Sequence, residues 1–291
     1  MSSAADVSVL TLVRGRRPQL RNLVTGLAES EESPRELVIA AMDDLSPAEL
    51  PDAPFPLRIV RVPQPGSVLP LAAARNAAAE AARGEVLLFL DVDCVPHPAL
   101  CTVLAKAARD TGGVVMGEVY YLPEGALDAP WRAADLHARA EHHPRRPTLA
   151  EGEVRPAPNY ALLWSLCIAM TRDTYARSGG FDVAYPGYGA EDTDFAFALE
   201  ARGIPFHLVG AYAYHQYHPV YRPPVRLAED LAANSRYFYA KWGRWPMEGW
   251  LAGLAELGII AWTPEGDTIE YLRPATQQEI DDSLVRDGKG Y

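Results

Sequence analysis

The chain has 291 residues, 48% of them hydrophobic, which is enough for a sizeable core in one large domain or in a domain with an extension. It carries 38 acidic and 27 basic side chains, and its formal net charge of −11 disfavours nucleic acid and anionic lipid as partners because it repels phosphate. If the ligand is itself anionic, the local field must be reversed, and a divalent metal is the usual means.

The three cysteines form no CxxC pair and do not read as a disulfide framework, which fits a reducing compartment. We expect Cys94, Cys101 and Cys167 to be small buried side chains. The first residues lack the pattern of a signal peptide, and the longest apolar stretch, residues 161–170, is far too short to span a membrane. The sequence therefore predicts a cytoplasmic protein with no transmembrane segment.

Short β-rich runs alternate with runs of helical periodicity in the first half of the chain. The β-branched run Val7–Val13 predicts a strand, and Pro18 opens a helix that continues to about Ser30. Four more strands are expected at residues 37–42, 57–62, 86–90 and 114–122, and two more helices at 69–83 and 98–109. This alternation predicts an α/β fold with an open, mixed but mostly parallel sheet flanked by helices, which binds ligands beyond the carboxyl ends of its strands. Neither a dinucleotide-binding GxGxxG nor a phosphate-binding GxxxxGK[ST] is present.

The second half contains two unusual segments. Residues 144–158 are rich in proline and charge and are expected to form a lid or binding loop. A helix at 195–202 and a strand at 206–209 complete the main part. Beyond residue 220 we expect a packed helical extension, with helices at 225–242 and up to 258, a hairpin at 261–272 and a loose polar tail over the last dozen residues.

An acidic pair follows the unbroken apolar run Val86–Leu90. Side chains two positions apart on a strand share one face, so the carboxylates of Asp91 and Asp93 are expected to point the same way. A divalent cation relieves their repulsion and can bridge to a diphosphate. A strand that merely ends in an acidic turn is the alternative, but the position at the carboxyl end of a buried strand favours the metal site.

A second acidic group follows two glycines in the segment GYGAEDTD, residues 187–194. Acids at a helix start interact favourably with the helix dipole, which is the simpler explanation. Glu191, Asp192 and Asp194 place three acids within four residues, which exceeds what capping requires. A carboxylate held there can deprotonate an acceptor hydroxyl as a general base, and Gly189 lets a substrate approach the backbone closely.

Two histidines, His215 and His218, occur in the segment YHQYH. Neutral imidazole is a good ligand for manganese and related ions alongside carboxylates, although a structural hydrogen bond is the commoner role of a lone histidine. Metal binding requires that the fold bring this segment to the acidic pair. Three other histidines are expected at the solvated surface, with contact to an acceptor as the alternative: His137, His142 and His143.

In chain order, the motifs are an arginine turn after the first strand, an acidic end of the second, ARNAAAEAARGE, LDVDC, GGFD, GYGAEDTDF and AYHQ. This order resembles the inverting GT-A glycosyltransferases of family 2. It is especially similar to the β-1,4-galactosyltransferase and chondroitin-polymerase type, whose GWGGED block is matched here by GYGAED. The resemblance covers residues 7–220 and implies a GT-A (Rossmann-like) domain at 1–220 that binds the nucleotide-sugar and carries out catalysis, followed by the extension at 221–291.

The resemblance also implies the reaction: Mn²⁺- or Mg²⁺-dependent transfer of a sugar from a nucleotide-sugar, expected to be a UDP-sugar, to the hydroxyl of a glycan, a lipid-linked or a small-molecule acceptor. Asp192 matches the catalytic base, and Asp93 and His215 match the metal ligands, with His218 in reserve. The positions matched to nucleotide binding are Thr11, Arg14, Asp43, Arg75 and Asp91. The positions expected to contact the sugar or the acceptor are Tyr188, Gly189, Glu191, Asp194 and Trp164.

Two positions depart from the galactosyltransferase pattern. Tyr188 replaces a tryptophan and Ala190 a glycine, so the resemblance does not carry galactose over as the transferred sugar. The competing hypotheses are a sugar-1-phosphate nucleotidyltransferase, which needs a glycine-rich basic loop where this chain has only one glycine, and a non-catalytic carbohydrate-binding protein. The joint presence of the acidic pair, the ED block and the histidines argues against the latter.

Overall fold

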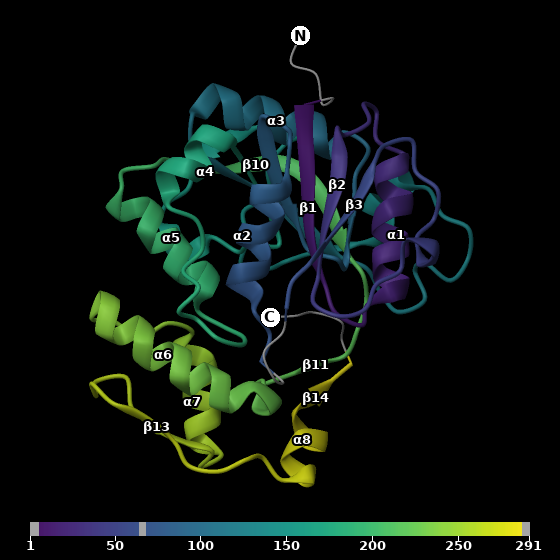
Figure 1. Cartoon of the computed structure of the whole chain (residues 1–291). Helices are drawn as coiled ribbons and strands as arrows, with labels where there is room; N and C mark the ends of the chain where they lie inside the picture. The colour runs from purple at the N-terminus through teal and green to yellow at the C-terminus, as the bar shows by residue number, and fades with distance from the viewer. Residues whose placement is uncertain (1–5, 64–67, 287–291) are drawn as a thin grey trace.

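A ten-stranded sheet forms the centre of the protein, seen here in a computed structural model that describes residues 6–63 and 68–286 (Figure 1). The main path of the sheet runs in the order β3-β2-β1-β4-β9-β6-β10-β5. Its strands are β1 (Val7–Val13), β2 (Glu36–Ala41), β3 (Leu57–Arg61), β4 (Val86–Leu90), β5 (Cys94–Pro96), β6 (Val114–Tyr121), β9 (Cys167–Thr171) and β10 (Phe206–His215). Two short strands lie beside this path, β7 (Glu141–His142) against β6 and β8 (Val154–Pro156) against β10.

The sheet is mixed and mostly parallel, as the alternation in the sequence predicted. Strands β1, β2, β3 and β4 pair in parallel, and β6 pairs in parallel with β10. Strand β9 is antiparallel to both β4 and β6, so it joins the two parallel groups, and β5 is antiparallel to β10. The carboxyl ends of β1, β2 and β4 therefore lie at one edge, which faces the C-terminal helices (Figure 1).

Helices cover both faces of the sheet because successive strand residues point to opposite sides. Val9 packs in a cluster with α1 (Arg17–Ala28) and α3 (Leu100–Thr111), whereas the next residue, Leu10, packs in a second cluster with α2 (Leu71–Ala81) and α5 (Glu191–Ala201). The short helix α4 (Arg172–Ser178) lies on the side of α2 and α5 (Figure 1). All five residues of β4 are buried, as expected for a strand covered on both faces.

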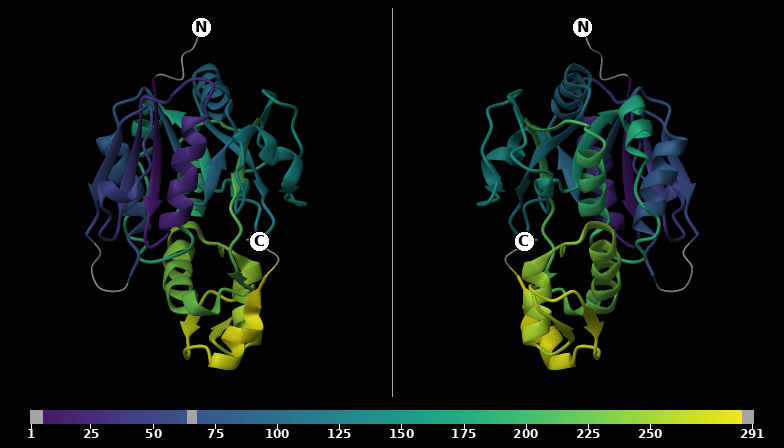
Figure 2. Two further views of the ribbon diagram at one scale, coloured as in Figure 1. Left: turned by 90° about the vertical axis from the view of Figure 1, so that its right-hand side faces the viewer. Right: turned by 90° about the vertical axis from the view of Figure 1, so that its left-hand side faces the viewer.

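The C-terminal part lies beyond the carboxyl edge of the sheet (Figure 2). It contains α6 (Ala228–Trp242), α7 (Glu248–Glu256), the antiparallel pair β12 (Ile260–Trp262) and β13 (Ile269–Tyr271), and α8 (Gln277–Ser283). These elements share a hydrophobic cluster of their own, around Leu231, Leu251 and Ile269. The Asn234 side chain on α6 donates hydrogen bonds to the carbonyls of Pro186 (2.8 Å) and Gly189 (2.9 Å), so α6 is tied to the loop before α5.

Two expectations about individual segments of the main sheet need correction, and one about the cysteines is confirmed. The expected strand at 206–209 continues to His215, because β10 pairs along its length with β6 and then with β5. The expected loop at 144–158 contains β8, which adds to the other side of β10. The three cysteines are free and buried, as predicted.

The loose tail expected over the last dozen residues is wrong for the part that the structure describes. Thr276 and Glu279 form a capping box that starts α8, and Arg273 pairs with Glu279 at 2.8 Å. Strand β14 (Leu284–Val285) then pairs with β11 (Val220–Tyr221). Residues 287–291 of the expected tail lie outside the described residues. No helix in the described part of the chain is both long and apolar enough to span a lipid bilayer.

Candidate functional site

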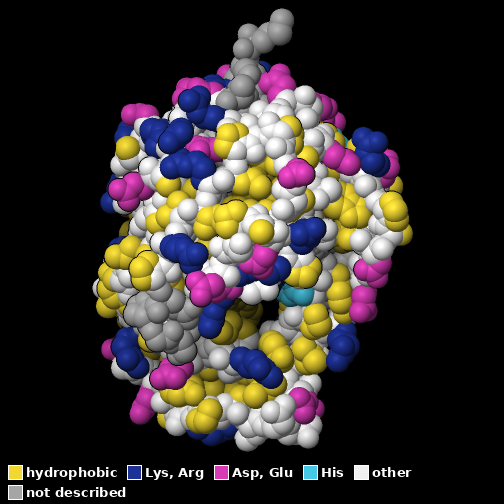
Figure 3. Space-filling view, turned by 45° about the vertical axis from the view of Figure 1, so that its right-hand side comes forward, with side chains coloured by type: hydrophobic (Ala, Val, Ile, Leu, Met, Phe, Trp, Pro, Cys, Tyr) yellow, Lys and Arg dark blue, Asp and Glu magenta, His cyan; other side chains and the backbone are white. Residues whose placement is uncertain are grey.

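The loops that follow β1 and β2 are tied to each other at the carboxyl edge of the sheet. One carboxylate oxygen of Asp43 accepts a hydrogen bond from the Gly15 backbone N–H at 2.6 Å, and the other accepts one from Arg17 Nη1 at 3.0 Å. Arg17 also pairs with Glu49 at 3.0 Å. Asp43 thus lies beside the arginine turn, although both of its oxygens have partners within the protein. Figure 3 shows a hollow between this part of the molecule and the C-terminal helices, with a histidine and charged side chains of both signs around its rim.

Asp93 lies at the centre of a group formed by three segments that are distant in sequence. Its carboxylate forms an ion pair with Arg16, from the turn after β1. His215 Nε2 lies 3.6 Å from one carboxylate oxygen and His218 Nε2 lies 3.4 Å from the other. The three candidate ligand atoms of Asp93, His215 and His218 lie within 4.8 Å of one another. The structure therefore brings together the predicted metal ligand, its predicted partner and the reserve residue.

Backbone hydrogen bonds hold this group in place. The end of β10 pairs with β5, with His215 opposite Cys94, and the Gln216 N–H donates to the Asp93 carbonyl at 2.7 Å. The buried Gln216 side chain accepts from Asn22 at 2.8 Å and donates to the Gln19 carbonyl at 3.0 Å, which fixes it to α1. The histidine segment is thus anchored on both sides of its contact with Asp93.

Burial and neighbouring charges shift the pKa values of this group. Burial by itself raises the pKa of Asp93, but His215, His218 and Arg16 outweigh it and hold that pKa well below its usual range. Burial lowers the pKa of His215 although the charge of Asp93 opposes this shift, and its buried Nδ1 has no hydrogen-bond partner within the described residues. Neighbouring Asp91 has its pKa raised to about 6, mainly by burial, against the lowering effect of Arg75. A carboxylate together with two imidazole rings is a donor set suited to Mn²⁺ and related ions.

A buried ion pair joins α2 to the start of α5. Arg75 and Glu191 are 6% and 5% exposed, and Arg75 Nη1 lies 2.9 Å from Glu191 Oε1. The second Glu191 oxygen accepts from the Gly189 N–H at 3.1 Å. The Arg75 guanidinium lies 5.1 Å from the centre of the Phe181 ring. Because one charge is deeply buried beside the other, this pair fixes the position of the GYGAED segment relative to α2.

Asp192 lies in the first turn of α5 and is half-buried. One of its carboxylate oxygens accepts a hydrogen bond from the Thr193 N–H at 2.7 Å. Burial and the charge of Glu191 raise its pKa to about 6, against the lowering effect of Arg75. Such a carboxylate is ionised at neutral pH and has more proton affinity than an exposed aspartate, as a general base requires.

The residues before α5 adopt left-handed backbone conformations. Gly189 has φ +100°, and a Cβ there would lie 2.5 Å from Leu231 of α6, so only glycine fits. Ala190 has φ +69° and is fully buried, which gives a physical reason for the glycine found at this position in the galactosyltransferase pattern. Tyr188 is 36% exposed and its ring stacks on Trp250 of α7 at 6.2 Å between ring centres. An aromatic surface from the C-terminal part thus lies next to the predicted base.

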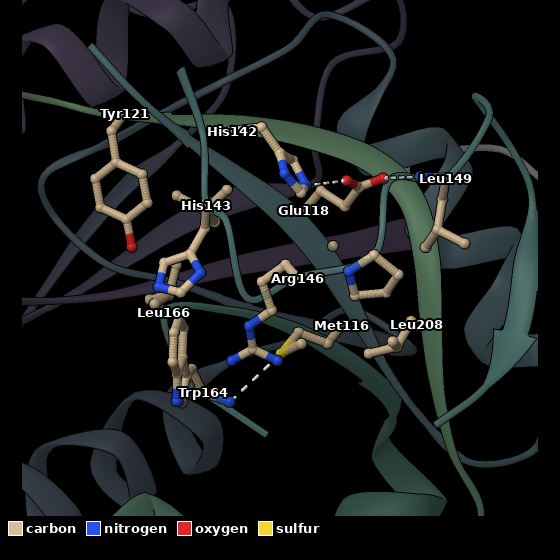
Figure 4. Close-up of a pocket in the computed structure, with 13 residues that line it drawn as sticks. Met116, Glu118, Tyr121, His142, His143, Arg146, Leu149, Trp164, Leu166 and Leu208 are labelled. Atoms are coloured by element: carbon tan, nitrogen blue, oxygen red, sulfur yellow. Dashed lines mark hydrogen bonds and ion pairs between the residues drawn. The ribbon is translucent and has the colours of Figure 1, made fainter. Parts of the chain in front are cut away.

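Four predicted site residues are not part of the groups around Asp93 and Asp192. Thr11 is fully buried within β1, and Arg14 is exposed on the turn that follows it. Asp194 is 2% exposed and accepts hydrogen bonds from Tyr185 (2.9 Å) and Trp242 (2.7 Å), so it joins α5 to α6. Trp164 lines a pocket together with residues of β6 such as Met116 and Glu118 (Figure 4).

Several residues of these groups were missed from the sequence. Arg16 was visible only as part of a basic turn, and nothing local indicates its contact with Asp93. His143 was expected at the solvated surface, but it is 1% exposed and lies against Trp164. His142 pairs with buried Glu118 at 3.1 Å, a contact that depends on the pairing of β7 with β6. In each case the signal lies in tertiary pairing rather than in local pattern.

Comparison with known proteins agrees with this geometry. Residues 8–164, more than half of the chain, match the family model described as Glycosyl transferase family 2. The validoxylamine A glucosyltransferase of Streptomyces hygroscopicus subsp. limoneus is 26% identical over 235 residues, covering 68% of this chain and 49% of that protein. Its counterpart from Streptomyces hygroscopicus subsp. jinggangensis (strain 5008) is 27% identical over 181 residues, covering 51% of this chain and 39% of that protein. The chain therefore spans about half or less of the length of these curated relatives.

Two solved structures show the shared fold. GalNAc-T7, crystallised with UDP, GalNAc and Mn²⁺, superposes with a TM-score of 0.53 at 15% identity, over 73% of this chain and 44% of that one. Residues 1–349 of TarS from S. aureus superpose with a TM-score of 0.51 at 14% identity, over 80% of this chain and 65% of that one. The mixed, mostly parallel sheet flanked by helices is thus of the GT-A type. Since the family match covers more than half of the sequence, including the turn that carries Asp91 and Asp93, the chain belongs to glycosyltransferase family 2.

Proposed function

We propose that this chain is a metal-dependent, inverting glycosyltransferase that moves a sugar from a UDP-sugar to an acceptor hydroxyl. The observation that carries the proposal is the convergence of Asp93, His215 and His218 at the carboxyl edge of the sheet. The two histidines lie outside the segment that matches the family model, so their approach to Asp93 is independent support. The UDP and Mn²⁺ named for the GalNAc-T7 structure support the choice of donor and ion.

Asp93 and His215 would hold the ion, Mn²⁺ or Mg²⁺, with His218 as the third candidate ligand. The bound ion would neutralise charge that develops on the departing UDP. Arg16 lies at the same carboxylate and adds positive charge where the diphosphate is expected, in a chain whose overall charge is negative. Asp91, Arg75 and Asp43 lie near this edge and are proposed to contact the nucleotide or the donor sugar, together with the exposed Arg14. The contact expected for Thr11 is wrong, because its side chain is fully buried within β1.

Asp192 is the proposed catalytic base. It removes the proton from the acceptor hydroxyl while that oxygen attacks the anomeric carbon, and the bond from that carbon to the UDP oxygen breaks. One direct displacement inverts the configuration, so a single carboxylate suffices and no covalent nucleophile is required. Glu191, Tyr188 and Gly189 are proposed to contact the sugar or the acceptor, while Asp194 supports them through its contacts with α6.

We also propose that residues 1–220 form the catalytic domain. Residues 221–291 then form an extension that helps to bind the acceptor. Trp250 from α7 lies against Tyr188, close to the base, which supports this division of roles. The names of the two Streptomyces relatives make glucose the first donor sugar to test. GYGAED is similar to the corresponding block of the galactosyltransferase and chondroitin-polymerase type. Galactose and the other sugars that enzymes of this type transfer are therefore the next donor sugars to test.

A thermal-shift and UDP-release screen tests the proposal. UDP-glucose, UDP-galactose and other nucleotide-sugars should raise the melting temperature in Mn²⁺ and not in EDTA, since a ligand that binds only the folded state stabilises it, by about 2.7 kcal/mol at 100 times Kd. The preferred donor should then release UDP when an acceptor is added. Equal stabilisation by UDP with and without metal would contradict the role given to Asp93 and the histidines.

The rate of transfer should depend on pH through Asp192. The base acts as its carboxylate, and its pKa is raised to about 6. The rate should therefore rise with pH through about 6, level off above that and fall about tenfold per unit well below it. Measuring transfer between pH 5 and 8 at saturating donor checks this. A rate that stays constant down to pH 5 would exclude a base with this pKa.

A further inference from the structure

Helix α6 of the C-terminal part lies next to α5 and to the loop that precedes it (Figure 1). Three side chains of α6 between Asp230 and Asn234 contact this loop. The loop contains the segment GYG, residues 187–189, and leads into the first turn of α5, where the proposed base Asp192 lies. The contacts made by α6 therefore bear on the position of the base.

The close approach of α6 explains the two glycines of the loop. A Cβ on Gly187 would collide with the carboxylate of Asp230, and Gly189 has Leu231 at the same place. Both glycines have positive φ values, +72° and +100°. Asp230 also accepts a hydrogen bond from the Tyr188 N–H at 3.3 Å. The glycines thus let α6 pack directly against the backbone of the loop.

Asn234 makes the main polar contact between α6 and the loop. Its side chain is fully buried, and its Nδ2 donates to three backbone carbonyls: Pro186 at 2.8 Å, Gly189 at 2.9 Å and Tyr188 at 3.3 Å. Its Oδ1 is also buried and has no hydrogen-bond partner among the residues that the structure describes. An unpaired buried oxygen is unfavourable, so the contribution of this amide lies in its two N–H donors.

The loop in turn determines how α5 starts. The Gly189 N–H donates to the Glu191 side chain at 3.1 Å. The Ala190 carbonyl accepts the Asp194 N–H at 2.8 Å, a hydrogen bond of the first turn. Ala190 has φ +69°, a left-handed conformation that is disfavoured for alanine by a factor of about 5 to 30 in population. Contacts from outside the loop must therefore hold it, and Asn234 binds the peptide group that joins Gly189 to Ala190.

We propose that Asn234 is a positioning residue for sugar transfer: its amide holds the left-handed turn at Gly189 and Ala190, and this turn sets the direction of the Asp192 carboxylate. The extension is then needed for the geometry of the base as well as for binding the acceptor. The proposal rests on the proposed function for the role of Asp192, but the effect of Asn234 on the turn can be measured without any ligand.

Asn234→Ala should lower kcat for transfer by about 10- to 100-fold, since a displacement of about 1 Å at the reacting groups has an effect of this size. The affinity for UDP in Mn²⁺ should stay unchanged, because the proposed metal ligands Asp93 and His215 belong to other segments. Kinetics at saturating donor and calorimetry of UDP binding measure the two effects. Ser235→Ala is the matched control, since Ser235 is also fully buried on α6 but its hydroxyl has no hydrogen-bond partner among the described residues.

A second substitution, Ala190→Gly, tests whether Asn234 acts through the turn. Glycine adopts the left-handed conformation without help, so Ala190→Gly should restore most of the kcat lost in Asn234→Ala, and the two effects should not be additive. Hydrogen exchange in the free protein gives the same comparison without substrate. The amides of residues 188–192 should exchange faster in Asn234→Ala and more slowly again in the double variant.

A folded Asn234→Ala variant with the wild-type kcat would overturn the proposal, and so would a loss of kcat that Ala190→Gly does not reduce. If Asn234→Ala does not fold, Asp230→Ala removes the weaker contact with the Tyr188 N–H and should give the same pattern to a smaller extent. Absence of both transfer and metal-dependent UDP binding in the wild type would contradict the proposed function. Hydrogen exchange would then still decide whether Asn234 holds the turn.

Discussion

Asp192→Asn is expected to slow sugar transfer by about 10²–10⁴-fold while donor binding stays unchanged. Asparagine has nearly the same shape and still accepts the hydrogen bond from the Thr193 N–H, so the first turn of α5 is retained. It cannot take up the proton of the acceptor hydroxyl. The measurement is the transfer rate at saturating donor, together with calorimetry of UDP binding in Mn²⁺.

Glu200→Gln provides the matched control on the same helix. Glu200 is exposed at the other end of α5, so removing its charge changes the net charge by the same amount without touching the site. Its transfer rate should equal that of the wild type. Full transfer activity in Asp192→Asn would show that another group is the base, and Glu191 would be the next residue to test.

Asp93→Ala and His215→Ala are each expected to weaken Mn²⁺ binding by at least the 10- to 100-fold typical for the loss of a residue that only supports a metal ligand. Donor binding should then lose its dependence on the metal, because the ion would no longer link UDP to the protein. Titration of Mn²⁺ by electron paramagnetic resonance, followed by UDP binding in Mn²⁺ and in EDTA, measures both effects.

His218→Ala decides whether the third group of the cluster is a ligand. Its Nε2 lies 3.4 Å from Asp93, but its side chain is more exposed than that of His215. A loss equal to that of His215→Ala would make it a ligand, and a small loss would make it a neighbour. His137→Ala is the control because His137 is exposed and packs on Tyr120, away from Asp93. Unaltered Mn²⁺ affinity in both Asp93→Ala and His215→Ala would contradict the proposed metal site.

The strands and helices of the main sheet could be predicted from local pattern. The apolar run Val86–Leu90 is strand β4 with the same bounds, and Val7–Val13 is β1. Helix α1 begins and ends within two residues of its expected limits, since the proline near its start and its apolar spacing are local features. Errors occurred where an element depends on a distant partner: β8 and the end of β10 exist because each pairs with a strand far away in the sequence.

The sequence by itself determined the α/β architecture and the chemical types present: a carboxylate pair after a buried strand, an acidic helix start and a histidine pair. It determined these because strand periodicity, helix signals and side-chain chemistry are local properties. Only the tertiary structure decided which of these groups meet. Arg16 and Asp93 are 77 positions apart and Arg75 and Glu191 are 116 apart, and sheet order rather than spacing joins them.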